Sequence, residues 1–423
     1  MAAAEPIVLI AGNDVVAGTG GHPSYVRAHG RAARRAGFAP HLFSLSQADG
    51  TVETEYGTVH QIGVRVGLER WPILRHRKNQ LVWRYAFLAR AVASFVRAHG
   101  GIRLVHSFGV FGAAGVFACR LLRRHGVEAA PILSSYDTAT REVTAKAWGV
   151  SGAHGPGHRL LYRLELAWVR RVVARYEAQG YLESRLVAVN YESVRRLLVA
   201  SYGIGDKIRK LSYASEAAFR PQPGPTSEAW RGVPDGGARE APRIVAVSRH
   251  DPRKGVDVLL RALARLRDRG VRFRACLVGG GALLAQHRRL VGQLDLDGTV
   301  SVTGPVPDPY PYLAGADVFV LPSLEEGSGS LSLLEALQAR VAVVASGIDG
   351  IPEDVTDGDT AVLVPPGDPV ALADGIERLL KDDALREGIA YRGHRLFEAR
   401  FSADAFSAAL RRTYAEVGIG VAP

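Results

Sequence analysis

The chain has 423 residues, of which 47% are hydrophobic and 22% charged. At about 150 residues per domain this predicts two or three globular domains and excludes a disordered or fibrous chain. The formal net charge of +11 is compatible with anionic partners, but no RNA-recognition, zinc-finger or basic-leucine-zipper pattern accompanies it, so we expect no nucleic acid as a partner.

Short apolar runs alternate with longer amphipathic stretches, which predicts repeated β-α units around parallel sheets. In the first half, strands are expected at Ile7–Ala11, His41–Ser44, Val59–Val66, Leu104–Ser107, Pro131–Ser134 and Leu186–Val189. The helices between them are expected at Ser24–Ala36, Val82–Ala98, Ala113–Arg124, Leu160–Tyr176 and Tyr191–Ser201. In the second half, strands are expected at Ile244–Val247, Arg274–Val278, Val300–Thr303, Val318–Leu321, Val341–Ala345 and Ala361–Val364. Its helices are expected at Val256–Arg267, Leu283–Leu294, Ser332–Ala339, Val370–Leu380 and Leu385–Phe397, with a further amphipathic helix at Ala403–Val417.

A segment rich in proline and glycine separates two halves of similar β-α pattern. We therefore expect an amino-terminal Rossmann-like domain over residues 1–220 and a linker over 221–242. A carboxyl-terminal Rossmann-like domain follows over 243–400, and a helix over 401–423, whose packing on the first domain the sequence leaves open. Because ligands of open parallel sheets lie off the carboxyl ends of the strands, we expect a cleft between two facing domains.

Targeting and covalent features are few. The two cysteines lie far apart, which excludes a disulfide scaffold and a cysteine-based metal site. No charge-free apolar run reaches the roughly 18 residues of a spanning helix, and the first residues lack the basic region and cleavage site of a signal peptide. We expect a soluble, cytoplasmic protein.

Three features of the sequence suggest a ligand-binding site: two loops that follow strands of the second half, and a pair of glycine-rich turns. After the strand Val318–Leu321 comes a loop of small and acidic residues that leads into a helix near Ser332, where backbone amides suit a phosphate and Glu335 suits a ribose diol. The spacing of Ser332 and Glu335 is equally that of a capping box. After the strand Ile244–Val247 come Arg249 and Lys254, which can neutralise a diphosphate or form an ordinary solvated turn.

Glycine-rich turns are the third signal. Gly20 and Gly21 follow the first strand, and Gly279 and Gly280 follow the strand Arg274–Val278. Glycine lets a ligand approach the backbone closely, but neither turn has the G-x-G-x-x-G pattern. The second turn is therefore either a tight strand-to-helix connection or the floor of a nucleotide site.

Taken in order, these segments resemble the retaining nucleotide-sugar glycosyltransferases of family four, which have the GT-B fold. The resemblance is strong from Val245 to about Asp368 and weaker but continuous over the first half. The matching segments are Ser248–Asp257, Leu277–Gly281, Thr303–Val306, Ala316–Ser323, the loop that leads to Ala336, Ser346–Gly358 and Val364–Asp368.

The resemblance implies an α/β GT-B fold with two facing Rossmann-like domains, a cleft and a carboxyl-terminal helix. It implies catalytic roles for Arg249 and Lys254, which grip the donor diphosphate, and for Glu326, which faces the donor sugar. The implied donor-binding residues are Gly20, Gly21, Gly279, Gly280, Gly304, Gly327, Ser328, Gly329, Ser330, Leu331 and Glu335.

Three departures from the family pattern affect these roles. Glu326 and Glu335 lie one position further apart than the family's usual spacing, so Glu325 stays an alternative to Glu326. After the strand Pro131–Ser134, the family often has a histidine where this chain has Tyr136 and Asp137, which become candidate contacts for the sugar or the acceptor together with His106. A buried structural role for His106 is the alternative. The family's common Asn-Gly after the last strand of the first domain is replaced by Tyr213–Glu216.

The expected function is transfer of a sugar from a nucleoside-diphosphate sugar to a hydroxyl acceptor, with retention of configuration. Two Asp-x-Asp triplets occur, at Asp295–Asp297 and Asp357–Asp359, and neither lies where a family member would hold a metal. We therefore expect no metal and no cofactor, and the expected donor is a UDP- or GDP-sugar. The alternatives are a GT-B sugar-nucleotide epimerase and a non-catalytic nucleotide-sugar-binding protein.

The acceptor is a sugar, a lipid-linked glycan or a small molecule. The basic amphipathic stretch Leu160–Ala174 favours an ordinary domain helix, and peripheral contact with the inner membrane face is the alternative. The basic region Gly67–Asn79 is either an ordinary loop or part of the acceptor site.

Overall fold

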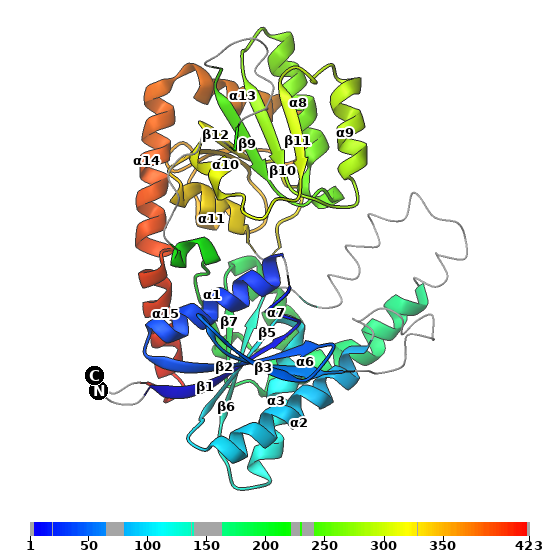
Figure 1. The fold of residues 1–423 in the computed structure, drawn as a ribbon, viewed down its shortest axis with the longest axis vertical. Coiled ribbons are helices and arrows are strands. Elements are labelled where there is room, and N and C mark those ends of the chain that lie inside the picture. The colour runs from blue at the N-terminus through cyan, green and yellow to red at the C-terminus, as the bar shows by residue number, and fades with distance from the viewer. Residues whose placement is uncertain are drawn as a thin grey trace. The chain divides into compact units, whose positions relative to one another are not determined.

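The computed structural model describes residues 4–18, 20–64, 80–136, 138, 163–220, 229–230, 241–327 and 329–420. The chain divides into two compact units. Unit 1 comprises Met1–Glu216 and Ala403–Pro423, and unit 2 comprises Ala217–Ser402. Each unit is built around its own sheet of mainly parallel strands (Figure 1).

The sheet of unit 1 has, among the described residues, eight strands in the order β3-β4-β2-β1-β5-β6-β7-β8. The strands are β1 (Glu5–Gly12), β2 (Phe38–Ser46), β3 (Gly50–Thr54), β4 (Gly57–Gly63), β5 (Leu104–Phe108), β6 (Ala130–Ser135), β7 (Leu186–Val189) and β8 (Ile208–Lys210). Neighbours pair in parallel except for the hairpin of β3 and β4. The short strands β3 and β8 were not predicted, because they lie at the sheet edges, are largely exposed and contain no apolar run.

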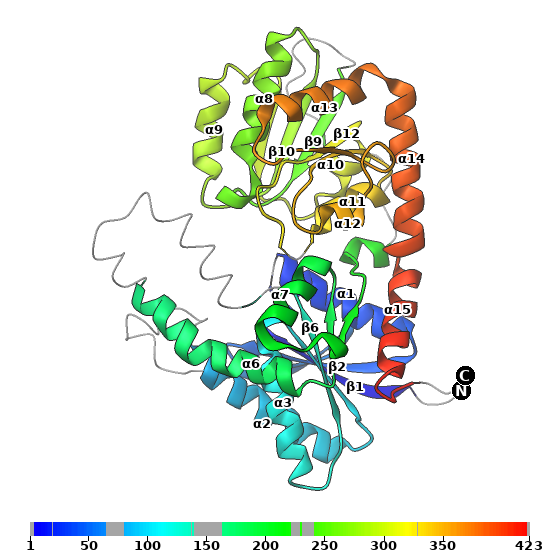
Figure 2. The ribbon, with the colours of Figure 1, turned by 180° about the vertical axis from the view of Figure 1, so that it is seen from behind.

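Helices cover both faces of this sheet. On one face, α1 (Gly21–Arg35) packs against α15 (Ala403–Ala415). On the other, α2 (Leu81–His99), α3 (Gly112–Arg123) and α6 (Ala174–Glu183) lie side by side (Figure 2). The helix α7 (Glu192–Tyr202) connects β7 to β8. The central strand β1 is buried on both faces, which is why it reads as one continuous apolar run.

Unit 2 has, in the part of the chain described, a six-stranded parallel sheet in the order β11-β10-β9-β12-β13-β14. The strands are β9 (Arg243–Val247), β10 (Arg274–Val278), β11 (Val300–Gly304), β12 (Val318–Leu321), β13 (Ala342–Ser346) and β14 (Val362–Val364). The helices are α8 (Val256–Asp268), α9 (Leu284–Gln293), α10 (Tyr310–Ala314), α11 (Leu331–Gln338), α12 (Ile351–Asp354), α13 (Pro369–Lys381) and α14 (Asp383–Arg400). One face of the sheet forms the main core with α8 and α13, and α14 packs on α11 and β13.

The strand order of unit 2 places its binding loops. The chain builds outward from β9 to β10 and β11, then returns to β12 beside β9 and builds outward in the other direction. Ligands of such sheets bind beyond the carboxyl ends of the strands at this reversal. The loops after β9 and β12 carry Arg249, Lys254 and Glu326. The predicted α/β class, with two Rossmann-like sheets and a carboxyl-terminal helix, is confirmed.

Candidate functional site

An ion pair between Lys254 and Glu326 lies at the centre of the loops that follow β9 and β12. Lys254 ends the short 3₁₀ turn Pro252–Lys254, and its Nζ donates to Glu326 Oε1 at 2.6 Å. The Ser323 hydroxyl donates to the same oxygen at 2.5 Å. The Glu326 side chain is 1% exposed and the Lys254 side chain 18%. A buried carboxylate requires such partners, since an unpaired one is strongly disfavoured.

The two loops are also joined through their backbones. The Arg253 carbonyl accepts from the amide of Leu324 at 2.7 Å and from that of Glu325 at 3.2 Å. Gly255, which precedes α8, has a φ of 58°, and a Cβ there would lie 2.1 Å from the Pro322 carbonyl oxygen. Only glycine fits this close approach, so Gly255 lets the Lys254 turn pack against the end of β12.

Asp349 is a member of this site that the sequence analysis did not single out. It lies in the loop after β13, and its Oδ2 accepts from the amides of Glu326 at 2.7 Å and Gly327 at 3.0 Å. Its φ of 50° is left-handed, a conformation that aspartate tolerates better than most residues. The signal that could have identified it is the Asp-Gly turn formed with Gly350. Asp349 therefore fixes the backbone that carries Glu326.

The loop that leads into α11 differs in detail from the expected arrangement. Ser330 caps the helix and accepts from the Leu333 amide at 3.3 Å, so the alternative in which Ser332 and Glu335 form a capping box does not hold. Leu331 is the first helical residue. The Gly327 amide is bound to Asp349, and the Gly329 amide donates to the Glu326 carbonyl at 3.0 Å. Ser328 lies outside the described residues.

Glu335 is half-buried on the second turn of α11. Burial, with smaller contributions from the carboxylates of Glu335 and Asp308, raises the pKa of the Tyr310 hydroxyl on the neighbouring helix α10 to about 12. Glu335 thus brings negative charge to the same end of the sheet as Glu326.

Arg249 lies in the loop after β9 with its side chain 62% exposed, and its guanidinium pairs with Asp251 at 2.9 Å. The next residue, His250, is buried and hydrogen-bonds to His287 of α9, with the two Nδ1 atoms 2.8 Å apart. Burial, with smaller contributions from His287 and Arg288, lowers the pKa of His250 to about 4. The Arg249 loop is therefore anchored through a neutral histidine.

The Gly279–Gly281 turn has a clear structural reason. A Cβ on Gly279 would lie 2.0 Å from the Ser248 carbonyl oxygen, and the Gly280 carbonyl accepts from the His250 amide at 2.8 Å. The Gly279 amide donates to the Gly304 carbonyl at 3.0 Å. Of the two readings of this turn, the geometry supports the tight connection, which also holds Gly304 and the Arg249 loop in place.

In unit 1, Gly20 and Gly21 stand at the start of α1. Gly20 has a φ of 96°, both residues are exposed, and a Cβ on either would meet no atom of the described residues within 4 Å. No acidic residue occupies the first turn of α1, so its amino-terminal end keeps its positive partial charge. Unlike Gly279, Gly21 is not required by packing against the part of the chain that the structure describes.

The three candidate sugar or acceptor contacts of unit 1 have different surroundings. His106 is fully buried, and its ring nitrogens hydrogen-bond to the hydroxyls of Tyr414 and Ser134, each at 2.8 Å. These contacts favour a structural role that ties β5 and β6 to α15. Tyr136 packs edge-to-face against Tyr25 at 4.5 Å. Asp137 lies outside the described residues, as does all of Gly67–Asn79.

The described part of the basic stretch Leu160–Ala174 is helical over residues 163–168 and continues through a π-helical turn at Val169–Val173. Val169 and Val173 lie in the core against α2 and α3. The arginines on the outer side are exposed at positions Arg163, Arg170, Arg171 and Arg175.

Comparison with known proteins agrees with the geometry of unit 2. Residues 241–382 match the family model described as Glycosyl transferases group 1. Unit 2 carries a glycosyltransferase group 1 domain. This domain contains Arg249, Lys254, Glu326, Glu335 and Asp349, all of the unit 2 side chains considered above as parts of one site.

Curated relatives extend the likeness. The chain is 31% identical over 185 residues to the alpha-D-kanosaminyltransferase of Streptomyces kanamyceticus, covering 43% of this chain and 48% of the relative. It is 34% identical over 198 residues to a phosphatidyl-myo-inositol mannosyltransferase of Mycolicibacterium smegmatis, covering 44% and 48%. The matches thus span about half the length of these relatives.

The whole fold is also similar to solved structures. The Anabaena protein HepE, solved in complex with UDP, superposes with a TM-score of 0.71 at 15% identity, covering 97% of this chain and 100% of HepE. At this identity the likeness shows the fold alone. Two Rossmann-like units and a carboxyl-terminal helix are the architecture of the GT-B glycosyltransferases, to which the solved neighbours belong.

Proposed function

We propose that this protein is a retaining, metal-independent glycosyltransferase that moves a sugar from a nucleoside-diphosphate sugar to a hydroxyl acceptor. The observation that carries the proposal is the Lys254–Glu326 pair at the strand-order reversal of unit 2, inside the glycosyltransferase group 1 domain. A parallel sheet binds its ligand at this reversal, and the loops there bring a cation and a buried carboxylate together.

Charge on the leaving group is the chemical problem in such a transfer. As the sugar–phosphate bond loosens to an oxocarbenium-like state, negative charge builds on the nucleoside diphosphate. Arg249 and Lys254 are proposed to bind that charge. Glu326 was expected to face the donor sugar, but its side chain is 1% exposed and paired with Lys254, so we propose instead that it holds the Lys254 ammonium in position. One preorganised contact of this kind typically contributes about 3–4 kcal/mol to lowering the barrier. Glu335 is proposed to accept hydrogen bonds from the ribose diol.

The donor is proposed to be a UDP- or GDP-sugar. The crystal structure of HepE with UDP supports a uridine nucleotide as the first to test. The side chains of Arg249 and Lys254 would supply the positive charge that a divalent cation supplies in other transferases. We therefore propose that no metal and no cofactor take part. Transfer that persists in excess chelator is the expected result.

The acceptor is proposed to be a sugar, a lipid-linked glycan or a small molecule with a free hydroxyl. A relative named for transfer to phosphatidyl-myo-inositol supports including lipid acceptors in the screen. Each of the described helices is too short or too polar to span a bilayer. The exposed arginines at Arg163, Arg170, Arg171 and Arg175 supply positive charge for peripheral membrane contact, and flotation with anionic and neutral liposomes tests it.

The deciding experiment is a thermal-shift screen of nucleoside diphosphates and nucleotide sugars, followed by transfer assays with the best donor. A bound nucleotide raises the unfolding temperature by mass action. The anomeric configuration of the product, read by NMR, tests retention. An altered free sugar formed without acceptor would instead indicate an epimerase, and nucleotide binding without turnover on any acceptor would indicate a non-catalytic binding protein.

A further inference from the structure

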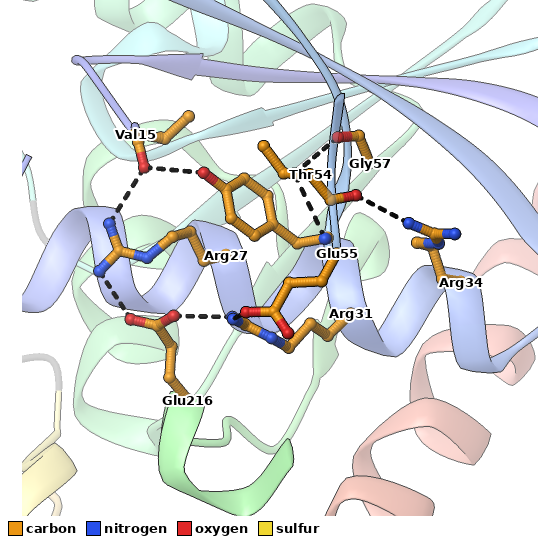
Figure 3. A network of polar contacts seen from close by, with 9 residues as sticks. Val15, Arg27, Arg31, Arg34, Thr54, Glu55, Gly57 and Glu216 are labelled. Carbon is orange, nitrogen blue, oxygen red and sulfur yellow. Dashed lines mark hydrogen bonds and ion pairs between the residues drawn. The ribbon is translucent and has the colours of Figure 1, made fainter. Parts of the chain in front are cut away.

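A network of charged side chains connects the loop between β1 and α1 to Glu216, the last residue of the first segment of unit 1. The guanidinium of Arg27, on α1, donates to the backbone carbonyls of Val15 at 3.1 Å and Gly18 at 3.0 Å. The same guanidinium donates to Glu216 Oε2 at 2.6 Å. Figure 3 shows Arg27 between Val15 and Glu216, with Arg31 on the other side of the Glu216 carboxylate.

The network is largely withdrawn from solvent. The side chains of Arg27, Arg31 and Glu216 are 16%, 7% and 10% exposed. Arg31 donates to Glu216 Oε1 at 2.7 Å and also pairs with Glu55. Burial by itself would raise the pKa of Glu216, but hydrogen bonds and charges from Arg27 and Arg31 outweigh it and leave the pKa lowered. Glu216 is therefore ionised, and loss of its charge removes a carboxylate that compensates two largely buried guanidinium groups.

The β1–α1 loop is held from several sides by these groups. The Tyr56 hydroxyl donates to the Val15 carbonyl at 3.2 Å, the same atom that Arg27 binds. Asp14 Oδ1 accepts from the amides of Val16 at 2.9 Å and Ala17 at 3.1 Å. With its carbonyls bound to Arg27, the loop leads directly into the exposed Gly20 and Gly21.

Glu216 stands at the junction of the two units. The next residue, Ala217, is the first of unit 2, and its carbonyl accepts from Gln338 Nε2 of α11 at 3.1 Å. Glu216 is thus bound to α1 of unit 1, and Ala217 is bound to α11 of unit 2. Each of these helices follows a loop that is proposed to bind the donor.

We infer that Arg27 and Glu216 are positioning residues that hold the β1–α1 loop in its ligand-binding shape and link that shape to the junction of the units. The inference rests on the proposed function for the identity of the ligand, a nucleoside diphosphate that meets Gly20 and Gly21. Loss of the link loosens the loop, which weakens donor binding while acceptor binding is spared.

The test uses the full-length chain with Glu216→Gln and Arg27→Lys as variants. The matched control is Asp404→Asn, which breaks an ion pair of α1 with α15 at the same 2.6 Å but with side chains 55% and 78% exposed. Hydrogen exchange is measured by mass spectrometry over residues 13–21, and UDP and GDP affinity by calorimetry. The donor and acceptor KM and kcat are measured on the same samples.

We expect faster exchange over residues 13–21 in Glu216→Gln, a donor KM raised about tenfold or more, and an unchanged acceptor KM. Arg27→Lys keeps a cation opposite Glu216 but cannot bind two carbonyls and Glu216 together. Its exchange rate and donor KM should therefore rise less than those of Glu216→Gln. The control should behave like the wild type. Unchanged exchange over residues 13–21 in both variants would overturn the inference, as would equal losses of donor and acceptor binding.

Failure of the proposed function is distinguishable from failure of this inference. If the wild type binds no nucleoside diphosphate and transfers no sugar, the proposed function is wrong, and hydrogen exchange over residues 13–21 still decides the positioning role. Should Glu216→Gln fail to fold, Arg27→Lys carries both readouts, because it leaves a cation opposite Glu216.

Discussion

The Nζ of Lys254 lies 2.6 Å from Oε1 of Glu326, although the two residues are 72 positions apart in the chain. They meet because β9 and β12 are neighbours in the sheet, and each residue lies in the loop that follows one of these strands. The Glu326 side chain is almost completely buried, whereas the Lys254 side chain is partly exposed to solvent. An arriving anion can therefore reach the ammonium while the carboxylate stays covered.

Replacing Lys254 should separate its chemical role from its structural one. Lys254→Met should lower kcat by about 10²–10³-fold, because the developing diphosphate charge loses its cation. It should also cost about 3–5 kcal/mol of unfolding free energy, since Glu326 stays buried without its ammonium. The double variant Lys254→Met with Glu326→Gln should regain stability but not turnover.

Steady-state kinetics and chemical denaturation of both variants check this. Lys381→Ala, which removes an ammonium paired with Glu377 on the surface of α13, is the control and should leave transfer unchanged. Near-normal turnover by Lys254→Met would refute the proposed role.

Asp349 should matter through its carboxylate and its left-handed backbone together. Asp349→Asn keeps an oxygen for the Glu326 and Gly327 amides and tolerates a positive φ, so it should retain most activity. Asp349→Gly suits the φ but removes the acceptor, and should reduce kcat more than it reduces stability. Asp349→Ala loses the acceptor and adds about 1–2 kcal/mol of backbone strain. Thermal unfolding and kcat should rank the variants in that order; wild-type kinetics for Asp349→Gly would contradict it.

Gly21 and Gly279 should respond to substitution in opposite ways. Gly21→Val adds bulk into open space, so the unfolding temperature should stay unchanged while the affinity for the donor falls. Gly279→Ala places a Cβ against the Ser248 carbonyl at a φ of 138° and should lower the unfolding free energy by more than about 1 kcal/mol. Calorimetric titration and denaturation measure the two effects. Wild-type donor affinity in Gly21→Val would mean that the ligand does not approach this loop.

Buried histidines should make the fold sensitive to mild acid. Burial lowers the pKa of His250 to about 4 and that of His29 to about 3, and it lowers the pKa of His106 and His287 as well. Asp257, near His287, opposes part of this shift. In the unfolded chain these histidines take up protons near pH 6.5, whereas in the folded chain they do not. Their contribution to the free energy of unfolding is therefore fully present above pH 6.5 and is lost as the pH falls toward 4.

Unfolding free energies measured between pH 8 and pH 4 check this expectation. His250→Gln should flatten the curve, while His125→Gln, at an exposed position, should leave its slope unchanged. A wild-type curve that is flat down to pH 4.5 would contradict the burial of neutral histidines.

Prediction from sequence succeeded for elements that are buried on both faces. β9 and β12 lie within one residue of their expected bounds, because a strand covered by helices on both sides is a continuous apolar run. It failed for β3 and β8, whose exposed edge positions impose no apolar pattern. At α11 the cap is Ser330 and not Ser332, because the cap depends on where the loop enters the helix, which spacing alone does not set.

The sequence by itself determined the β-α alternation of both halves and the loops that carry Arg249, Lys254 and Glu326. These features follow from local hydrophobic patterns and from motifs a few residues long. The tertiary structure alone decided which side chains meet: Glu326 with Lys254, Asp349 with the Glu326 backbone, and Glu216 with Arg27, 189 positions away. Such contacts depend on strand order and chain reversal, because folding joins loops that are neighbours at a sheet edge and not in the chain.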